Sequence, residues 1–217
     1  MKKSRIAIVL SLALLAGCAG QRTRLSEEHH KTLTTEPVHA VHSVATAGFM
    51  VQSTGYTTAG VLFSPLVVLA QAAEGASMIS ELGLEDPVVR VKERVLVALE
   101  GSYKIPNVIR VAQPVNRLAS DTKSMSGLLF EVRTIKWGID NNRVKYAAGV
   151  RVVRLADNVT LWDAVCNDAI VDKDKPSPTA DALRADKGAL LKAKLNQAAD
   201  ACADQLAGWA IERVERR

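Results

Sequence analysis

The sequence predicts an α+β domain in which a mainly antiparallel sheet of three to five strands is covered by two or more helices. Two patterns predict this fold. Residues 127–166 alternate apolar and polar side chains over three segments separated by turn-forming residues, which is typical of strands with one buried face. Residues 189–215 place apolar side chains at helical spacing, which predicts a long C-terminal helix. A chain of 217 residues is long enough to bury one sizeable core.

The first 17 residues have the pattern of a secretory signal peptide. Three basic residues precede an apolar run over residues 6–15. This run is too short to span a bilayer as a helix, because a spanning helix needs about 20 apolar residues. The segment that follows, Leu15-Ala16-Gly17-Cys18, resembles the lipobox of bacterial lipoproteins.

This resemblance implies a lipid anchor. In the family, the cysteine receives a diacylglyceryl thioether, the peptide is cleaved before it, and the new N-terminus is acylated. Cys18 would then carry several acyl chains, which together hold a protein stably on a membrane. Ala19 rather than Asp follows the cysteine, which resembles the pattern of lipoproteins sent to the outer membrane. The resemblance therefore implies a lipid-anchored outer-membrane protein whose domain faces the periplasm.

Residues 18–39 are polar and charged, and they predict a lipidated tether between the anchor and the domain. All four histidines of the chain lie within 14 residues, in this segment and just after it: His29, His30, His39 and His42. Metal binding is one interpretation of this group, but nothing in the sequence fixes a coordination geometry, so we expect no metal site. Because residues 43–217 contain no histidine, Ser-His-Asp and Cys-His catalysis are excluded there. We expect no catalytic residues and no cofactor.

Residues 40–85 form a charge-poor apolar segment that should pack on the domain or extend it. From residue 37 to residue 73 there is no Lys, Arg, Asp or Glu, and we expect an extended segment near 41–52 and a helix over 66–82. If this segment is buried, it completes the core; if it is exposed, it forms an apolar patch that marks a binding surface. The second interpretation gives the candidate partner-binding residues, which are Phe49, Val61, Leu62, Phe63 and Leu66.

The globular domain is predicted over residues 86–217 and begins with a helix. Asp86-Pro87 supplies an N-cap and a first-turn proline, and Gly101 occurs where a left-handed C-cap fits. Between them, apolar residues recur at helical spacing: Val88, Val91, Val95 and Leu99. A short extended segment is expected over 105–111.

Three strands then form the predicted antiparallel meander. The apolar phase of the first strand changes after Val132, which predicts a β-bulge near Thr134. The segment Asp140-Asn141-Asn142 predicts the first hairpin turn and Ala156-Asp157-Asn158 the second, because Asn and Asp tolerate left-handed backbone. The third strand should end at Cys166.

The remaining sequence predicts a solvated loop over 172–178, a short helix over 180–186 capped by Thr179, and the long helix over 189–215. The apolar stripe of the long helix should lie on the sheet, and it comprises Leu191, Leu195, Ala198, Cys202, Leu206 and Trp209.

Cys166 and Cys202 are the only cysteines besides Cys18. An exported protein meets an oxidising compartment, and the two residues are predicted on facing surfaces of the sheet and the helix, so we expect a disulfide. Such a bridge closes a loop of about 36 residues and stabilises the fold by roughly 4 kcal/mol in the chain-entropy account. Two buried free thiols are the alternative.

The formal net charge of +5 does not indicate nucleic-acid binding. Three of the 28 basic residues belong to the signal peptide, so the remaining chain carries 25 basic against 23 acidic residues, too even a balance for a phosphate-binding footprint. Carboxylate pairs such as Asp200 and Asp204 are interleaved with Lys and Arg and predict a solvated helix face. Trp137, Trp162 and Trp209 occur at apolar positions, which favours the core over a ligand groove.

The segments Leu155-Ala156-Asp157 and Leu161-Trp162, at the end of the meander and before a capped helix, are similar to the small α/β domains of envelope-assembly lipoproteins. This group includes lipoproteins that activate peptidoglycan synthases or serve secretion and transport machines, and the N-terminal domain of the Tol-system propeller protein. The similarity covers about residues 86–217 and departs at Asn158-Val159-Thr160, where a Thr-Gly turn is common. It implies a fold and no functional residues.

We therefore expect a non-enzymatic outer-membrane lipoprotein that acts as an interaction or assembly subunit of a cell-envelope complex. Its expected partners are the membrane, through the acyl chains, and an envelope protein or further copies of the chain itself. The alternative is a periplasmic carrier that binds a small apolar or lipid ligand between the sheet and the helices.

Overall fold

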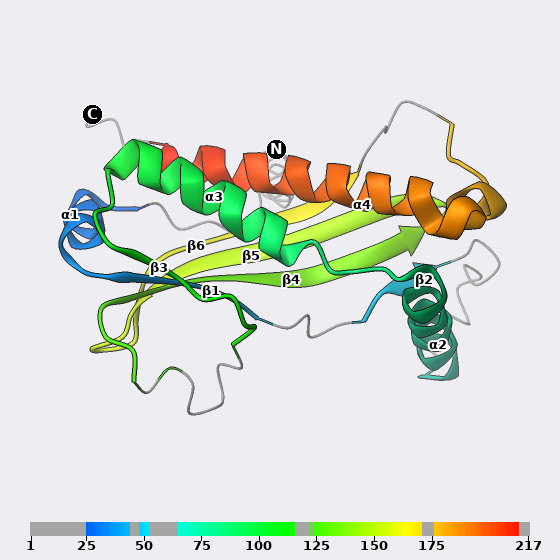
Figure 1. The fold of residues 1–217 in the computed structure, drawn as a ribbon, viewed down its shortest axis with the longest axis horizontal. Helices are drawn as coiled ribbons and strands as arrows, with labels where there is room; N and C mark the ends of the chain where they lie inside the picture. The colour runs from blue at the N-terminus through cyan, green and yellow to red at the C-terminus, as the bar shows by residue number, and fades with distance from the viewer. Residues whose placement is uncertain are drawn as a thin grey trace, which may run out of the picture.

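The computed structural model describes residues 25–43, 48–52, 65–115, 122, 124–170 and 176–212 (Figure 1). Over these residues the chain forms an α+β fold in which two long helices lie on one face of a six-stranded sheet. The predicted signal peptide and the predicted lipobox with Cys18 lie outside the described residues.

The elements follow one another in the order α1 (Glu27–Thr35), β1 (Val38–Ser43), β2 (Met50–Gln52), α2 (Pro65–Leu82), α3 (Val88–Tyr103), β3 (Val108–Arg110), β4 (Leu128–Asp140), β5 (Arg143–Arg154), β6 (Val159–Ile170) and α4 (Ala180–Ile211).

The sheet is mixed, so the prediction of a mainly antiparallel sheet was wrong. The strand order is β3-β1-β4-β5-β6, and β2 pairs with β4 off this path. Strand β1 runs parallel to both β3 and β4, and β2 also runs parallel to β4. The chain passes from β1 through β2, α2 and α3 before it reaches β3, and a helical crossover of this kind joins parallel strands.

The meander of β4, β5 and β6 is antiparallel, as the alternating pattern predicted. The register between β4 and β5 shifts between Thr134 and Lys136, which confirms the predicted bulge. Asn141 and Asn142 both have positive φ in the first hairpin turn, and Asn158 has positive φ in the second. Strand β6 continues beyond its predicted end at Cys166, as far as Ile170.

The segment 18–39, predicted as a tether, is folded from residue 25 onward. Ser26 caps helix α1, because its hydroxyl accepts a hydrogen bond from the backbone N–H of His29 at 3.2 Å. Leu25 and Leu33 are buried in the core, and β1 occupies a central place in the sheet. The polar composition of this segment concealed the few apolar residues that attach it to the sheet and its helices.

Helix α3 begins after Asp86-Pro87 as predicted, but it continues past Gly101 to Tyr103. Its end is at Lys104, which has left-handed backbone and whose N–H donates to the carbonyl of Glu100 at 2.9 Å. The extra turn is held because the Tyr103 hydroxyl donates to the carbonyl of Ala210 on α4 at 2.8 Å. Packing against α4 therefore outweighs the local preference of glycine for a helix end.

Helix α4 consists of two helical parts, which agrees with the two helices predicted there. Residues 185–188 have non-helical backbone, and the Thr179 hydroxyl accepts a hydrogen bond from the N–H of Ala182 at the start of the first part. The predicted stripe faces the sheet: Leu191, Leu195, Ala198, Cys202 and Leu206 are buried, whereas Trp209 is only partly buried.

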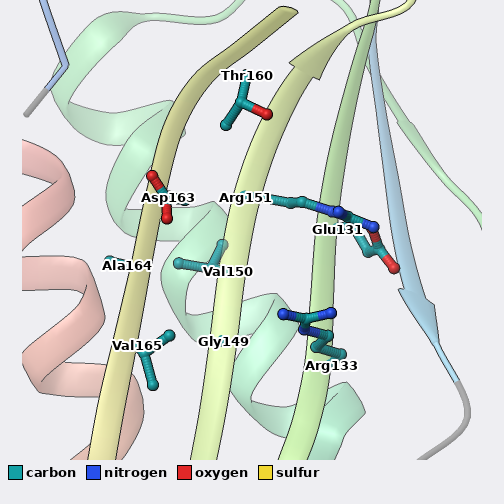
Figure 2. A pocket seen from close by; sticks show the side chains of 9 residues that line it. All are labelled: Glu131, Arg133, Gly149, Val150, Arg151, Thr160, Asp163, Ala164 and Val165. Atoms are coloured by element: carbon teal, nitrogen blue, oxygen red, sulfur yellow. The ribbon is translucent and has the colours of Figure 1, made fainter. Parts of the chain in front are cut away.

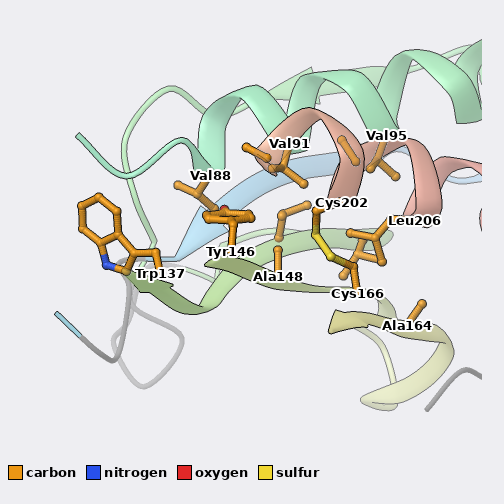
Figure 3. Close-up of a cluster of buried hydrophobic side chains, with 14 of the residues drawn as sticks. Val88, Val91, Val95, Trp137, Tyr146, Ala148, Ala164, Cys166, Cys202 and Leu206 are labelled. Carbon is orange, nitrogen blue, oxygen red and sulfur yellow. A yellow bond between two sulfur atoms is a disulfide. The ribbon is translucent and has the colours of Figure 1, made fainter. Parts of the chain in front are cut away.

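The main core lies between the sheet and the layer of α3 and α4 (Figure 3). Trp162 and Tyr146 are fully buried in it, and Trp137 is nearly so, which places these two tryptophans in the core as predicted. A disulfide joins Cys166 on β6 to Cys202 on α4, with the Cα atoms 5.5 Å apart. The bridge links the edge strand of the sheet to its covering helix.

Candidate functional site on the open face of the sheet

Helices α3 and α4 cover one face of the sheet, and in the described part of the chain no helix covers the opposite face (Figure 1). At one end of this open face, the segment that follows β3 packs on the sheet. Its Val115 forms a small buried apolar cluster with Val41, Leu129 and Val153. Beyond this cluster the surface of β4, β5 and β6 is hollowed by a depression of about 280 Å³.

Charged side chains from neighbouring strands meet in this depression (Figure 2). The strand register causes this, because Glu131 lies opposite Arg151, and Arg151 lies opposite Asp163 on the next strand. Cross-strand neighbours on one face of a sheet have Cβ atoms within about 5.5 Å, so opposite charges form a row across three strands. The residues that line the depression are Glu131, Arg133, Gly149, Val150, Arg151, Thr160, Asp163, Ala164 and Val165.

Gly149 leaves the space for the hollow. It lies in the next row, opposite Arg133 on β4 and Val165 on β6. A Cβ atom at this position would approach Ile135 Cδ1 to 3.2 Å and Val165 Cγ2 to 3.6 Å, so any larger side chain would fill the depression. The hollow is therefore a consequence of one missing side chain on an otherwise continuous strand.

Glu131 is the fixed charge of the site, since only 3% of the residue is exposed. The Ser43 hydroxyl donates a hydrogen bond to its Oε1 atom, and the Arg151 Nε–H donates to its Oε2 atom at 2.6 Å. The Arg151 Nη2 atom lies 2.5 Å from the same Oε2 atom. A carboxylate held in this way is compensated within the protein and cannot easily leave its place.

Arg133 differs from Arg151, because it is exposed and the described residues offer it no ion pair. Its guanidinium stands beside the depression without a carboxylate of its own (Figure 2). A guanidinium presents several N–H donors in a planar fork that fits a carboxylate or phosphate. The site can therefore accept an anionic group that approaches the open face.

A second polar cluster is buried on the helix side, at the start of α3. The Thr134 hydroxyl donates to Asp86 Oδ1 at 2.6 Å and lies 2.8 Å from the Tyr146 hydroxyl, while the N–H of Val88 donates to the same Asp86 oxygen at 3.1 Å. The Asp86 Oδ2 atom is buried without a hydrogen-bond partner. Burial raises the pKa of the Asp86 carboxyl above its ordinary value, and the hydrogen bonds from Thr134 and Val88 only partly oppose this effect.

A third cluster lies between β1 and α3. The buried ammonium group of Lys92 donates to the carbonyl of Val111 at 3.2 Å, and the buried Nδ1 atom of His42 has no hydrogen-bond partner. Burial lowers the pKa of His42, and the positive charge of Lys92 lowers it further. His42 is therefore a buried side chain of strand β1, and its surroundings disfavour the protonated form. In the described part of the chain, no three His, Cys, Asp or Glu side chains are grouped as a metal site requires.

The candidate partner-binding residues are not brought together on a described surface. Phe49 is 0% exposed and packs edge-to-face on Trp137, with the ring centroids 5.2 Å apart, so the structure places it in the core instead. Its neighbours on β2 pair with β4, and this pairing explains the burial. Val61, Leu62 and Phe63 lie outside the described residues, and Leu66 is described only as part of the α2 backbone.

The charged residues of the open face were not singled out from the sequence. Glu131, Arg133 and Arg151 looked like the ordinary polar half of alternating strands. The available signal was Gly149 within a strand, because an isolated glycine in a strand often marks a place where another group approaches closely.

No protein-family model matches the chain, and no curated protein matches it. Partial similarity is found to a DUF330-family protein from Xanthomonas campestris, at 15% identity over 81% of this chain and 83% of that chain, with a TM-score of 0.42. A PelC dodecamer from Paraburkholderia phytofirmans gives 10% identity over 90% of this chain and 99% of that chain, also with a TM-score of 0.42. These values are too low to support a function, so the function is argued from the chain's own residues.

Proposed function

We propose that this protein is a lipid-anchored, non-enzymatic lipoprotein of the outer membrane that binds another envelope protein through the open face of its sheet. The partner presents a carboxylate to Arg133. When the partner binds, it covers the open face and excludes water from the depression beside Gly149.

The observation that supports this proposal is the one-sided covering of the sheet, combined with the exposed guanidinium of Arg133, for which no ion pair is found among the described residues. The neighbouring charges are already compensated, because Glu131 is bound by Arg151 and Ser43. Arg133 is thus the charge of the depression that is available to an incoming carboxylate, and complementary charge at an interface selects the partner and fixes its register. The lipobox residues Leu15 to Cys18 support the place of action.

The carrier hypothesis has less support. The space between the sheet and the helices is filled by large side chains, among them Phe130, Trp162 and Leu195, each at most 2% exposed. The 280 Å³ depression lies on the other face and is lined by four charged residues. Pockets for apolar ligands are predominantly lined by hydrophobic and aromatic side chains, so this depression suits a polar group.

The anchor is tested first. The full-length protein is expressed in a bacterial host and purified from its membranes, and the mass of the N-terminal peptide is measured. Cleavage before Cys18 with added diacylglyceryl and acyl masses is expected. An intact N-terminus, or a mature Cys18 without lipid, contradicts the anchor.

The binding face is tested by charge reversal. We expect Arg133→Glu to weaken capture of the partner by the full-length tagged protein roughly tenfold, because the substitution replaces attraction by repulsion. Lys31→Glu is the matched control, since Lys31 is an exposed cation on helix α1 and does not line the depression. Equal capture by both variants would contradict the proposed face. Capture of the chain by itself alone would identify a second copy as the partner, and the Arg133→Glu variant would then dissociate the oligomer.

A further inference from the structure

Helix α2 stands apart from the rest of the domain (Figure 1). Its C-terminal half is attached: Met78 is buried, Gly75 lies against the backbone of Phe49, and Arg184 Nη2 on α4 lies 2.8 Å from Glu74 Oε1. These contacts hold the helix to β2 and α4. The N-terminal half extends away from them, past the sheet on its open side (Figure 1).

Among the described side chains in the N-terminal half of α2, those at 69, 70, 72 and 73 are apolar and exposed, and Gln71 between them is buried. Leu69 is 65% exposed, and Ala70, Ala72 and Ala73 are exposed as well. The first charged residue of the helix is Glu74, so no charge occurs over its first nine residues, 65–73. Exposed apolar residues are ordinary when they occur singly, as Val97 does on α3 between charged neighbours, but a continuous charge-free helix end is not.

The position of the anchor favours a lipid surface as the group that covers this helix end. Only six residues separate Cys18 from Leu25, where the folded domain begins. Fully extended, this link spans about 25 Å at about 3.5 Å per residue, so the domain stays close to the bilayer. Helix α1, next to the link, and helix α2 lie at opposite ends of the long axis (Figure 1).

We propose that the charge-free end of α2, with Leu69 at its exposed side, inserts into the headgroup region of the membrane that holds Cys18. This inference rests on the lipid anchor of the proposed function. The acyl chains hold one end of the domain and α2 holds the other, so the long axis lies along the membrane. The open face of the sheet then faces the membrane, and its partner is a protein at the same membrane surface. None of the helices in the described ranges has the length and apolarity of a bilayer span, and shallow insertion of an apolar helix surface requires neither.

The test measures the depth of single positions in the lipidated protein. Because Cys18 is acylated and Cys166 is bonded to Cys202, an introduced cysteine is the only free thiol. Leu69→Cys is labelled with an environment-sensitive fluorophore, and the protein is reconstituted in vesicles of phosphatidylethanolamine and phosphatidylglycerol with nitroxide-labelled lipid. Val97→Cys, 60% exposed in the wild type, matches Leu69 in exposure, and Ser80→Cys reports an exposed polar position on α2 itself.

We expect the label at position 69 to shift its emission to the blue and to lose roughly half of its intensity to the nitroxide lipid. The labels at 97 and 80 should remain in water. A label at 69 that stays in water, or that is shielded without quenching by the lipid, overturns the inference; the second result indicates a protein contact. In both cases an acylated Cys18 in the same sample leaves the proposed function intact. An unacylated Cys18 overturns the anchor, and the inference with it.

Discussion

Arg151 and Arg154 lie on the same strand, β5, and each forms an ion pair. The two pairs show how burial changes the contribution of an ion pair to the stability of the fold. Arg151 binds Glu131, whose side chain is 4% exposed, whereas Arg154 binds Asp157, whose side chain is 43% exposed. A buried charge that loses its partner cannot recover its hydration, while an exposed charge can. The first pair is therefore needed by the fold, and the second is not.

Arg151→Ala should lower the free energy of unfolding by about 3 kcal/mol, because the buried carboxylate of Glu131 loses the guanidinium that compensates its charge. Arg154→Ala should lower it far less, because both charges of that pair stay hydrated when they separate. Urea denaturation followed by tryptophan fluorescence measures both values. Similar losses for the two variants would show that Glu131 is hydrated in solution.

The cluster of Asp86, Thr134 and Tyr146 shows what sequence reasoning reaches at a single residue. Asp86 was predicted as the helix cap, and its Oδ1 atom does accept from the N–H of Val88. Its contact with Thr134 was not predicted, because the two residues are 48 positions apart. Their meeting depends on how α3 lies across the sheet.

Asp86→Asn and Asp86→Ala should separate two effects of this carboxyl, its role as a hydrogen-bond acceptor and the cost of its buried charge. Asn keeps an acceptor oxygen for Thr134 and Val88 and removes the buried charge, so at pH 7 it should be at least as stable as the wild type. Ala removes the acceptor of the Val88 N–H and leaves the Thr134 hydroxyl to bond with Tyr146, and it should cost about 1–3 kcal/mol. The free energies of unfolding at pH 7 provide the comparison, and an Asn variant as unstable as the Ala variant would contradict it.

The raised pKa of Asp86 also predicts how the stability of the protein changes with pH. Because folding raises the pKa of Asp86, the folded protein holds this proton more tightly than the unfolded chain. The penalty of the buried charge is present at neutral pH and disappears as the pH falls through the raised pKa. The stability difference between Asp86→Asn and the wild type should therefore shrink from pH 7 towards pH 4, as chemical denaturation across this range would measure. A difference that grows on acidification would contradict the assignment.

At the scale of elements, local patterns and long-range pairings were predictable to different degrees. The strands β4 to β6 follow from alternation and from turn residues such as Asn141, which act within a few positions. Strand β1 was missed as a central strand, because it contacts β3 and β4 some 70 to 90 residues away. Its residues 38–43 carry two histidines, which concealed their burial.

Gly75 determines how closely α2 packs on β2. A Cβ atom at this position would lie 1.6 Å from the carbonyl oxygen of Phe49, so Gly75→Ala must push the helix away from the strand. We expect a loss of about 1–3 kcal/mol and faster proteolysis within α2. Gly101→Ala is the control, because no atom lies within 4 Å of a Cβ atom there, and it should stabilise α3 by about 0.5–1 kcal/mol. Stabilisation by both substitutions would contradict the packing of α2.

The disulfide fastens α4 to the edge strand β6. Replacing Cys166 and Cys202 together by alanine should lower the free energy of unfolding by about 2–4 kcal/mol, because the unfolded chain regains the freedom of the closed loop. Urea denaturation of the double variant and of the wild type measures this difference. The same measurement on reduced wild-type protein checks that the loss comes from the disulfide. A double variant as stable as the wild type would show that the two thiols are not bonded in solution.

At the scale of the whole molecule, the sequence predicted the fold class and a place of action, but not the site. The place of action stays a prediction, and it comes from a local pattern, the resemblance of residues 15–18 to a lipobox. The open face arises only when α3 and α4 pack on the same side of the sheet, and the depression only when Gly149 aligns with Arg133. Neither arrangement is encoded within one element, so the charged residues of the face looked like ordinary solvent-exposed positions.

The central claim is that the open face of the sheet binds an envelope protein. The most direct measurement places a photo-crosslinking side chain at position 133 of the full-length lipidated protein in living cells, and at position 97 on the helix side as the control. We predict that position 133 crosslinks one envelope protein and that position 97 does not. Crosslinks from position 97 alone, or none from either position, would contradict the claim.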